Sequence, residues 1–436
     1  MNMQATDFGM LPRREMLRLG GCTALGALLA PSLARAQAAP ASTSGNVAAF
    51  LDKWVAPGKF PGIITSLGLP GQPTQFTLRG SEGFTDADPV TPDSLFRIYS
   101  MTKPITGMAA MMLIGEGKLG LDQPLADILP LFAKMQVQVT PDGSITDLRP
   151  AKTALTIRHL LTHTSGLGYT IIQKGPIKKA YEDAGLVSGR ISRIPIPGLD
   201  RGAAVPSLTL FADRLARMPL VYEPGTTWSY SVGLDLMGRV IELVSGLPFD
   251  VFLKRRIFEP CGMTSTWFQV PRAASHRLTT NYGALGTNLV PIDKGEDSIF
   301  LDKPAFPFGG SGLVSSPRDY DRFLTMLANF GRVGRTQVMG ELAVRVGTGD
   351  LLPEGVAGPA MMAAPSNFGA GGRVGIGPER GIYGWAGAAG TVGTVDMRRG
   401  IRSSIFAQFM PPNASALLPE YQRALQADVQ ALTARS

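Results

Sequence analysis

Strand-like segments lie near both ends of the chain, and helical patterns fill most of the region between them. Two short alternating segments, "IITSLGL" (63–69) and "QFTLRG" (75–80), flank the turn sequence "PGQPT" and predict a β-hairpin. Near the other end, "IYGWAGAAGTVGTVDMRRG" (382–400) and "IRSSIFAQFMP" (401–411) also have the character of strands. This order predicts one antiparallel sheet built from the two termini, with a mainly helical domain inserted.

The predicted fold class is therefore α/β, of the α+β type, with helices flanking the sheet. We expect one domain over 46–412, whose α/β part comprises 46–100 and 350–436 and whose helical part covers about 101–349. Residues 413–436 are expected to form a C-terminal helix that packs on the sheet. The helical patterns of the middle region are "TIRHLLTH", "SLTLFADRLARM", "VGLDLMGRVIELVSG", "PFDVFLKRRIFEPCGM" and "SPRDYDRFLTMLANFG".

The composition fits a well-buried core and gives no sign of a nucleic-acid partner. Of the 436 residues, 44% are hydrophobic and 17% are charged, which suffices for one large domain or two interleaved ones. The formal charge is +8, but the basic residues are scattered and no basic run is interleaved with aromatic residues. We interpret the excess as general surface charge and expect no nucleic-acid binding.

The first 36 residues have the features of an export signal. The twin arginines Arg13 and Arg14 precede an apolar stretch and the small-residue pattern "ARA" at 34–36. We expect twin-arginine export, removal of 1–36, a linker over 37–45 and a periplasmic or secreted protein. Because the apolar stretch is shorter than the ~18 residues of a membrane span, we expect no stable membrane anchor.

The chain has two cysteines, Cys22 in the predicted signal and Cys261 in the predicted mature protein. Cys22 follows "LGG", as in a lipoprotein signal, but most of the apolar stretch comes after it, which disfavours lipidation. A lone cysteine forms no internal disulfide, so the mature protein is expected to be stable through its core alone.

Ser100 and Lys103 form the one S-x-x-K sequence in the chain, where a strand-like run gives way to a helical one. Positions i and i+3 share a helix face, so the lysine can reach the serine, and a neutral lysine can take the proton that makes serine nucleophilic. The alternative is that Ser100 caps the helix and Lys103 is a solvated first-turn residue. The pair alone does not decide between the two.

Two distant segments offer the other parts of a catalytic serine site. Tyr230 lies at a turn before an amphipathic helix and has the chemistry to shuttle a proton, although a packed aromatic residue would give the same pattern. The strand containing Trp385, Ala386, Gly387 and Ala388 is rich in small residues that let a backbone approach a ligand, although a glycine-rich edge strand has the same composition.

Together these segments resemble the serine β-lactamase and penicillin-binding-protein superfamily, and within it the class C β-lactamase-like esterases called family VIII carboxylesterases. The resemblance spans about residues 45–412. It rests on the ordered motifs "RIYSMTKPIT", "LTIRHLLTHTSGLGY", "YEPGTTWSYSVGLDLMGRVIE", "IFEPCGMTST", "FGGSGLVSSPRDYDRFLTML" and "GWAGAAGT".

The resemblance implies a role for each catalytic candidate. Ser100 would be the acyl-forming nucleophile and Lys103 its base partner. Tyr230 matches the tyrosine of the family's Y-x-N triplet and would work with Lys103 to protonate the leaving group and to activate water for deacylation. The backbone N–H groups of Ser100 and Ala388 would hold the oxyanion.

Two departures from the family pattern concern the substrate. Val232 replaces the asparagine of Y-x-N, and Trp385, followed by Ala386 and Gly387, begins the strand that has K-T-G in lactamases. In lactamases these polar groups help to hold the amide and carboxylate of the substrate. Their loss favours neutral, apolar acyl groups, and W-x-G is similar to the W-G-G of the esterase branch. The predicted substrate-binding residues are therefore Val232, Trp385, Ala386 and Gly387.

The sequence therefore predicts a serine hydrolase that cleaves small-molecule carboxylic esters with short or medium acyl chains, with at most weak β-lactam hydrolysis. One alternative is a β-lactamase or D-alanyl peptide hydrolase, and another is a non-catalytic penicillin-binding sensor. Long Gly- and Pro-bearing segments at 171–202 and 281–310 are expected to border the site and to influence specificity.

Other hydrolase chemistries have less support. The G-x-S-x-G nucleophile elbow does not occur in the sequence. His159 and His163 are spaced four apart like a zinc pair, but no glutamate follows His159, so we interpret both as packing at a helix end. His276 lies in a polar segment without a visible partner. We expect no metal and no cofactor.

Overall fold

The computed structural model describes residues 45–55, 59–196, 202–286, 288–359, 365–412 and 415–434. The chain divides into two units, Met1–Ala41 and Ser42–Ser436, and all of the described residues belong to the second. The predicted export signal and nearly all of the predicted linker lie outside the described residues. Within the described part of the chain, no helix is long and apolar enough to cross a membrane.

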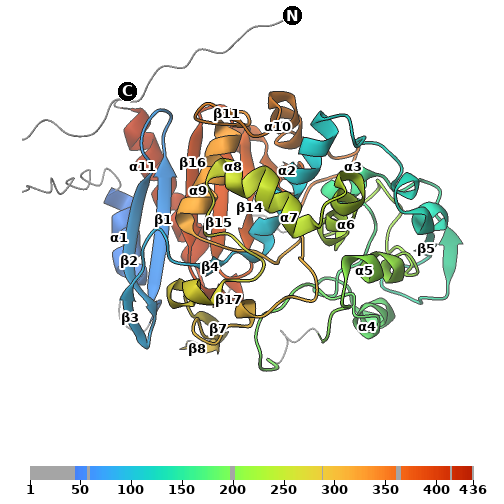
Figure 1. The fold of residues 1–436 in the computed structure, drawn as a ribbon, viewed down its shortest axis with the longest axis horizontal. Coiled ribbons are helices and arrows are strands. Elements are labelled where there is room, and N and C mark those ends of the chain that lie inside the picture. The colour runs from blue at the N-terminus through green and yellow to red at the C-terminus, as the bar shows by residue number, and fades with distance from the viewer. Residues whose placement is uncertain are drawn as a thin grey trace, which may run out of the picture. The chain divides into compact units, whose positions relative to one another are not determined.

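An eight-stranded antiparallel sheet joins the two ends of the chain, which confirms the predicted fold class. Strand β1 pairs with β16 in the register Ile64 to Phe406 and with β2 in the register Ile64 to Leu78. Figure 1 shows blue β1 lying among the orange and red strands. In spatial order the strands are β12 (Ser366–Phe368), β13 (Arg373–Gly375), β14 (Ile382–Gly387), β15 (Thr391–Asp396), β16 (Ile401–Phe406), β1 (Gly62–Gly68), β2 (Gln75–Gly83) and β3 (Asp86–Pro89).

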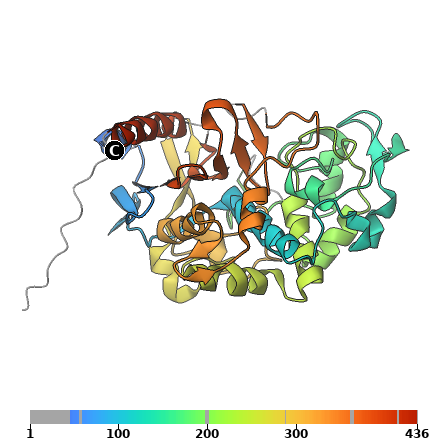
Figure 2. The same ribbon diagram turned by 90° about the horizontal axis from the view of Figure 1, so that it is seen from above.

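Helices cover both faces of this sheet, because successive residues of a strand point to opposite faces. Ile63 and Ile405 belong to the apolar cluster formed with α1 (Gly45–Trp54) and α11 (Leu417–Thr433). On the other face, the Phe406 ring contacts the Tyr320 ring of α9 (Pro317–Ala328), with 6.3 Å between ring centroids. Figure 2 shows α11 and α9 on opposite sides of the strands.

Helix α9 packs on the sheet, although it lies within the stretch of about 101–349 that was expected to form the helical part. Its buried residues include Tyr320, Phe323 and Leu327, and it packs against β15 and β16 rather than among the other helices. An amphipathic helix must cover its apolar stripe, and the free face of the sheet supplies the matching surface. The α/β part therefore includes 317–328.

The helical part is organised around α2 (Thr102–Gly115), which is buried along almost its whole length. It packs against α6 (Gly233–Ser245) and α10 (Glu341–Gly347). A helix that is apolar on all sides belongs in a core, so a lysine in its first turn is held inside the protein. The remaining helices there are α3 (Ile157–Leu161), α4 (Gly175–Asp183), α5 (Leu208–Leu215), α7 (Phe249–Leu253) and α8 (Glu259–Cys261).

Short strands anchor the segment that leads into α2. Strand β4 (Phe96–Arg97) pairs with β9 (Val314–Ser315). The fully buried Arg97 forms an ion pair with Asp293, with Nη2 and Oδ2 2.5 Å apart, and donates from Nη1 to the carbonyl oxygen of Thr279. The other short strands are β5 (Gln136–Gln138), β6 (Leu148–Pro150), β7 (Asn281–Leu285), β8 (Asn288–Asp293), β10 (Arg332–Val333), β11 (Thr336–Gln337) and β17 (Phe409–Met410).

Candidate active site

Ser100 lies on a single 3₁₀ turn, Tyr99–Met101, between β4 and α2. Its hydroxyl oxygen is 3.2 Å from Lys103 Nζ and 2.8 Å from the Tyr230 hydroxyl. The N-cap of α2 is Met101, without a side-chain capping bond, so Ser100 does not cap the helix. Tyr99 has a φ of 39°, a conformation that non-glycine residues adopt at a cost and that is concentrated at functional sites. The backbone thus holds Ser100 where its side chain faces two partners.

Lys103 has no solvent exposure, and its amino group donates to at least two acceptors. It donates to Ser100 Oγ and, at 2.7 Å, to the carbonyl oxygen of Gly310. The N–H of Gly310 in turn donates to Asp235 Oδ1 at 2.9 Å. A Cβ on Gly310 would lie 2.6 Å from Asp235 Oδ2, so a side chain there would force the Asp235 carboxylate to shift. The alternative that Lys103 is a solvated surface residue is therefore wrong.

Tyr230 completes a three-residue cluster at Ser100. Its hydroxyl donates to Ser100 Oγ and accepts a bond from the indole N–H of Trp385 at 3.2 Å. Lys103 Nζ lies 4.4 Å from the centroid of the Tyr230 ring. The tyrosine is 7% exposed and is surrounded by the rings of Tyr169, His163, Trp228 and Trp385.

Strand β14 approaches the backbone that precedes the nucleophile. A Cβ on Gly387 would lie 2.4 Å from the carbonyl oxygen of Ile98, so a side chain there would push the strand away. Ala388 begins the turn after β14 and packs against the apolar cluster that contains Tyr99. This close approach brings the strand predicted to carry the second oxyanion donor next to the turn that carries Ser100.

The predicted substrate-binding residues differ in accessibility. Val232 is fully buried in the main core, and its N–H donates to the carbonyl oxygen of Gly168. It therefore has no accessible surface of its own, and its predicted contact with a substrate stays a prediction. Trp385 is 6% exposed and Ala386 is partly exposed, while Gly387 is buried.

Several residues around the cluster escaped the sequence analysis. Gly310, Asp235, Tyr169 and Trp228 lie in the motifs that carried the family resemblance, but no residue-type rule marked them. The contribution of these residues to the cluster depends on main-chain hydrogen bonds and ring contacts, which only the folded chain brings together.

The two histidines of "HLLTH" have different positions. His159 caps α3, accepting from the Thr156 N–H at Nδ1, in agreement with packing at a helix end. His163 instead lies against the Tyr230 ring, with 4.7 Å between ring centroids. Burial and, second, the charge of Lys103 hold the pKa of His163 well below its usual value, so the imidazole is neutral.

One cavity opens beside Tyr230 and has a volume of about 590 Å³. Ile172, Trp228 and Val356 contribute to its apolar walls. Ile172 belongs to the predicted loop 171–202, so this loop contributes to the cavity beside Tyr230, which Ser100 and Lys103 do not line.

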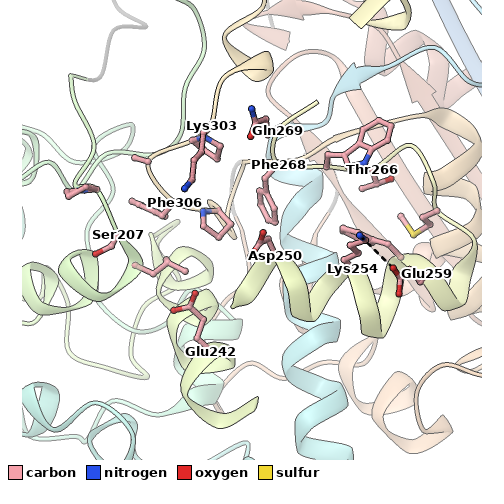
Figure 3. A pocket seen from close by; sticks show the side chains of 18 of the residues that line it. Ser207, Glu242, Asp250, Lys254, Glu259, Thr266, Phe268, Gln269, Lys303 and Phe306 are labelled. Carbon is pink, nitrogen blue, oxygen red and sulfur yellow. Dashed lines mark ion pairs between the residues drawn. The ribbon is translucent and has the colours of Figure 1, made fainter. Parts of the chain in front are cut away.

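A larger cavity of about 790 Å³ lies elsewhere, and Ser100, Lys103 and Tyr230 are not among the residues that line it. Figure 3 shows Phe268 and Phe306 in this cavity, with charged side chains such as Asp250 and Lys303 around them. Among the described residues, no three His, Cys, Asp or Glu side chains cluster closely enough to hold a metal ion.

The sequence model of the beta-lactamase family matches residues 47–428. Among curated proteins, Protein Rv1367c of Mycobacterium tuberculosis is 34% identical over 290 residues, which are 65% of this chain and 67% of that protein. Esterase EstB of Burkholderia gladioli is 29% identical over 315 residues, covering 68% of this chain and 73% of the esterase. Acyltransferase calJ of Penicillium decumbens is 30% identical, covering 62% and 63% of the two chains.

Solved structures show the same fold. EstCE1, described as a hydrolase with promiscuous acyltransferase activity, superposes with a TM-score of 0.71 at 23% identity, covering 88% of this chain and 98% of its own. Simvastatin synthase (LovD) from Aspergillus terreus superposes with a TM-score of 0.69 at 22% identity, covering 90% and 100% of the two chains.

Proposed function

Because the chain belongs to the beta-lactamase family, we propose that it is a serine carboxylesterase that cleaves small esters through an acyl-enzyme on Ser100. The observation that carries the proposal is the position of Ser100 Oγ, within hydrogen-bonding distance of both Lys103 Nζ and the Tyr230 hydroxyl. A serine hydroxyl becomes an effective nucleophile when such neighbours take its proton. The sensor alternative would acylate and then stall.

In the acylation step, Ser100 Oγ bonds to the ester carbonyl carbon while its proton passes to the Lys103–Tyr230 pair. The N–H groups of Ser100 and Ala388 stabilise the oxyanion of the tetrahedral intermediate. The bond to the leaving alkoxide then breaks, and the pair protonates the alkoxide to an alcohol. In the second step a water gives its proton to the pair and its oxygen attacks the acyl carbon. The bond between this carbon and Ser100 Oγ then breaks, the pair returns the proton to Oγ, and the carboxylic acid leaves.

The proposed preference is for neutral esters with short to medium acyl chains. Trp385 stands where a lactamase has the lysine of K-T-G, and its indole N–H is bonded to Tyr230 instead of being available to a substrate carboxylate. The cavity beside Tyr230 has apolar walls, which suit an uncharged group. These two features favour an ester over the alternatives of a β-lactam or a D-alanyl peptide.

A second candidate is acyl transfer to an alcohol, which the named activities of calJ and EstCE1 support. The same acyl-enzyme would serve, with an alcohol replacing water in the second step. We expect added 1-butanol to raise the rate of p-nitrophenol release and to yield the butyl ester. An unchanged rate and no butyl ester would rule out transfer to this alcohol.

We also propose export to the periplasm through the twin-arginine pathway. The proposal rests on Arg13, Arg14 and the "ARA" pattern at 34–36. Cell fractionation of the full chain and of an Arg13→Lys, Arg14→Lys variant tests it. We expect the original chain, but not the variant, in the periplasmic fraction. Equal export of both proteins would contradict the proposal.

The central test compares residues 37–436 with the Ser100→Ala variant on p-nitrophenyl acetate, p-nitrophenyl butyrate and a chromogenic cephalosporin. Steady ester turnover that the variant lacks supports the esterase. Turnover mainly of the cephalosporin favours the lactamase, and a single stoichiometric burst indicates the sensor. Full ester activity in the variant would overturn the assignment of the nucleophile.

A further inference from the structure

His163 binds the main chain on both sides of Tyr230. Its carbonyl oxygen accepts from the N–H of Ser229 at 2.9 Å, and its Nδ1 accepts from the N–H of Ser231 at 3.2 Å. The Ser231 hydroxyl is 3.0 Å from the same nitrogen. The two residues that flank the tyrosine are therefore tied to a single residue of a distant segment.

The imidazole also packs directly on the side chain that it brackets. Its centroid lies 4.7 Å from that of the Tyr230 ring, and 5.9 Å and 5.3 Å from those of Trp228 and Phe368. The Trp385 indole bonds to the tyrosine hydroxyl at the far end of the ring. The main-chain hydrogen bonds therefore fix the backbone position of Tyr230, and the ring contacts fix the direction of its side chain.

This arrangement has unfavourable features that a packing role alone does not require. His163 has a φ of 58°, in the left-handed region that side chains rarely adopt, and it is fully buried. Its Nε2 has no hydrogen-bond partner among the described residues. Because Nδ1 accepts from a main-chain N–H, the ring proton of the neutral imidazole lies on Nε2. A leucine would fill the same space without the unpartnered nitrogen, but it offers no acceptor to Ser231.

We propose that His163 is a positioning residue that holds the Tyr230 hydroxyl 2.8 Å from Ser100 Oγ, a role that rests on the proposed function of these two residues. His163 touches neither substrate nor reacting atoms in this role. It acts through Tyr230, so its effect on the rate exists only while Tyr230 carries a hydroxyl. That dependence separates positioning from a general contribution to folding.

The test is a double-mutant cycle on p-nitrophenyl butyrate. His163→Ala should lower kcat about 30-fold or more with KM changed less than about 3-fold, because a misplaced general acid–base group loses much of its effect. His163→Asn should stay within about 5-fold of the original kcat, since its side-chain oxygen can accept from Ser231 and asparagine tolerates positive φ. In a Tyr230→Phe background, His163→Ala should change the residual rate less than about 3-fold.

His159 provides the matched control. It is also buried and also accepts a main-chain N–H at Nδ1, but it caps α3 away from the serine. His159→Ala should lower the melting temperature without changing kcat. Where His163→Ala gives no folded protein by circular dichroism, His163→Leu takes its place in the cycle.

Equal losses from His163→Ala with and without the Tyr230 hydroxyl would overturn the positioning role, as would a kcat within 3-fold of the original. A second readout separates this failure from failure of the proposed function. The rate at which a fluorophosphonate labels Ser100, followed by intact mass, depends on the same cluster but not on ester turnover. The same cycle in this assay should show the same dependence on Tyr230.

Discussion

The indole N–H of Trp385 donates a hydrogen bond to the hydroxyl of Tyr230 at 3.2 Å. The sequence alone marked Trp385 as an apolar replacement for a substrate-binding lysine, and the fold gives it a second task. By occupying one lone pair of the tyrosine oxygen, it directs the hydroxyl proton toward Ser100. The residue that replaces a lysine of the family pattern thus also orients the hydroxyl of Tyr230, the proposed acid–base group.

Trp385→Phe should therefore impair catalysis more than binding. Phenylalanine keeps most of the ring but loses the N–H, and the loss of one buried hydrogen bond of about 1 to 1.5 kcal/mol corresponds to roughly a 10-fold fall in kcat. Steady-state kinetics on p-nitrophenyl butyrate measure it. A rise in KM at constant kcat would show that the indole serves only to bind substrate.

Lys103→Met and Tyr230→Phe should each lower kcat by about 10²- to 10⁴-fold, the usual contribution of a positioned acid–base group. Methionine fills the space of the buried lysine stem without a charge, so the fold should survive. Circular dichroism checks the fold of each variant, and hydrolysis of p-nitrophenyl acetate measures its rate. Retention of more than a tenth of the rate by either folded variant would contradict its role.

Gly387→Ala should reduce kcat/KM by at least about 100-fold, the scale of losing one oxyanion donor. The added Cβ would lie 2.2 Å from Thr391 Oγ1 and 2.4 Å from the carbonyl oxygen of Ile98, which forces β14 away from the turn of Ser100. Gly340→Ala is the control, because a Cβ there meets no atom within 4 Å and φ is −61°. If both variants have the same activity, the close approach of β14 has no catalytic consequence.

Glu82 should make stability depend on pH. Burial raises the pKa of its carboxyl to about 7. The hydrogen bond that the carboxyl accepts from Ser94 Oγ lowers the pKa but does not offset the effect of burial. Because the folded state binds the proton more tightly than the unfolded state, whose pKa is 4.5, the stability contributed by this group falls as pH rises from 4.5 through 7. Glu82→Gln should thus gain stability relative to the original protein, by about 1 to 2 kcal/mol at pH 8 and little at pH 4.5.

Urea unfolding at several pH values measures this difference. Glu341→Gln, at an exposed position of α10, is the control and should give a constant, small difference. A difference for Glu82→Gln that does not grow between pH 5 and pH 8 would contradict the assignment.

The sequence predicted the fold class and the grouping of Ser100, Lys103 and Tyr230 because both depend on residue type and order. Strand patterns at the two ends required a shared sheet, and Ser100, Lys103 and Tyr230 carry chemistry that a spacing rule can recognise. The Gly310 carbonyl and the two bonds around Tyr230 from His163 could not be predicted, because any residue offers main-chain atoms and only tertiary contacts select them. The complete burial of Val232 could not be predicted either, because its place next to Tyr230 in the sequence does not determine which way its side chain points at the start of α6.

Strand β1 is hydrogen-bonded to β16, more than three hundred residues later, and β14 lies at the turn of Ser100. Ser100, Lys103 and Tyr230 are therefore synthesised well before β14 and β16, the strands that complete the sheet. A nascent chain that stops before residue 382 contains Ser100, Lys103, Tyr230 and the β1–β2 hairpin, but it lacks β14 and β16, the second sheet partner of β1. The surroundings of Ser100 are therefore complete only when the last part of the chain has been made, because β14 and the strand that closes the sheet against β1 both come from it.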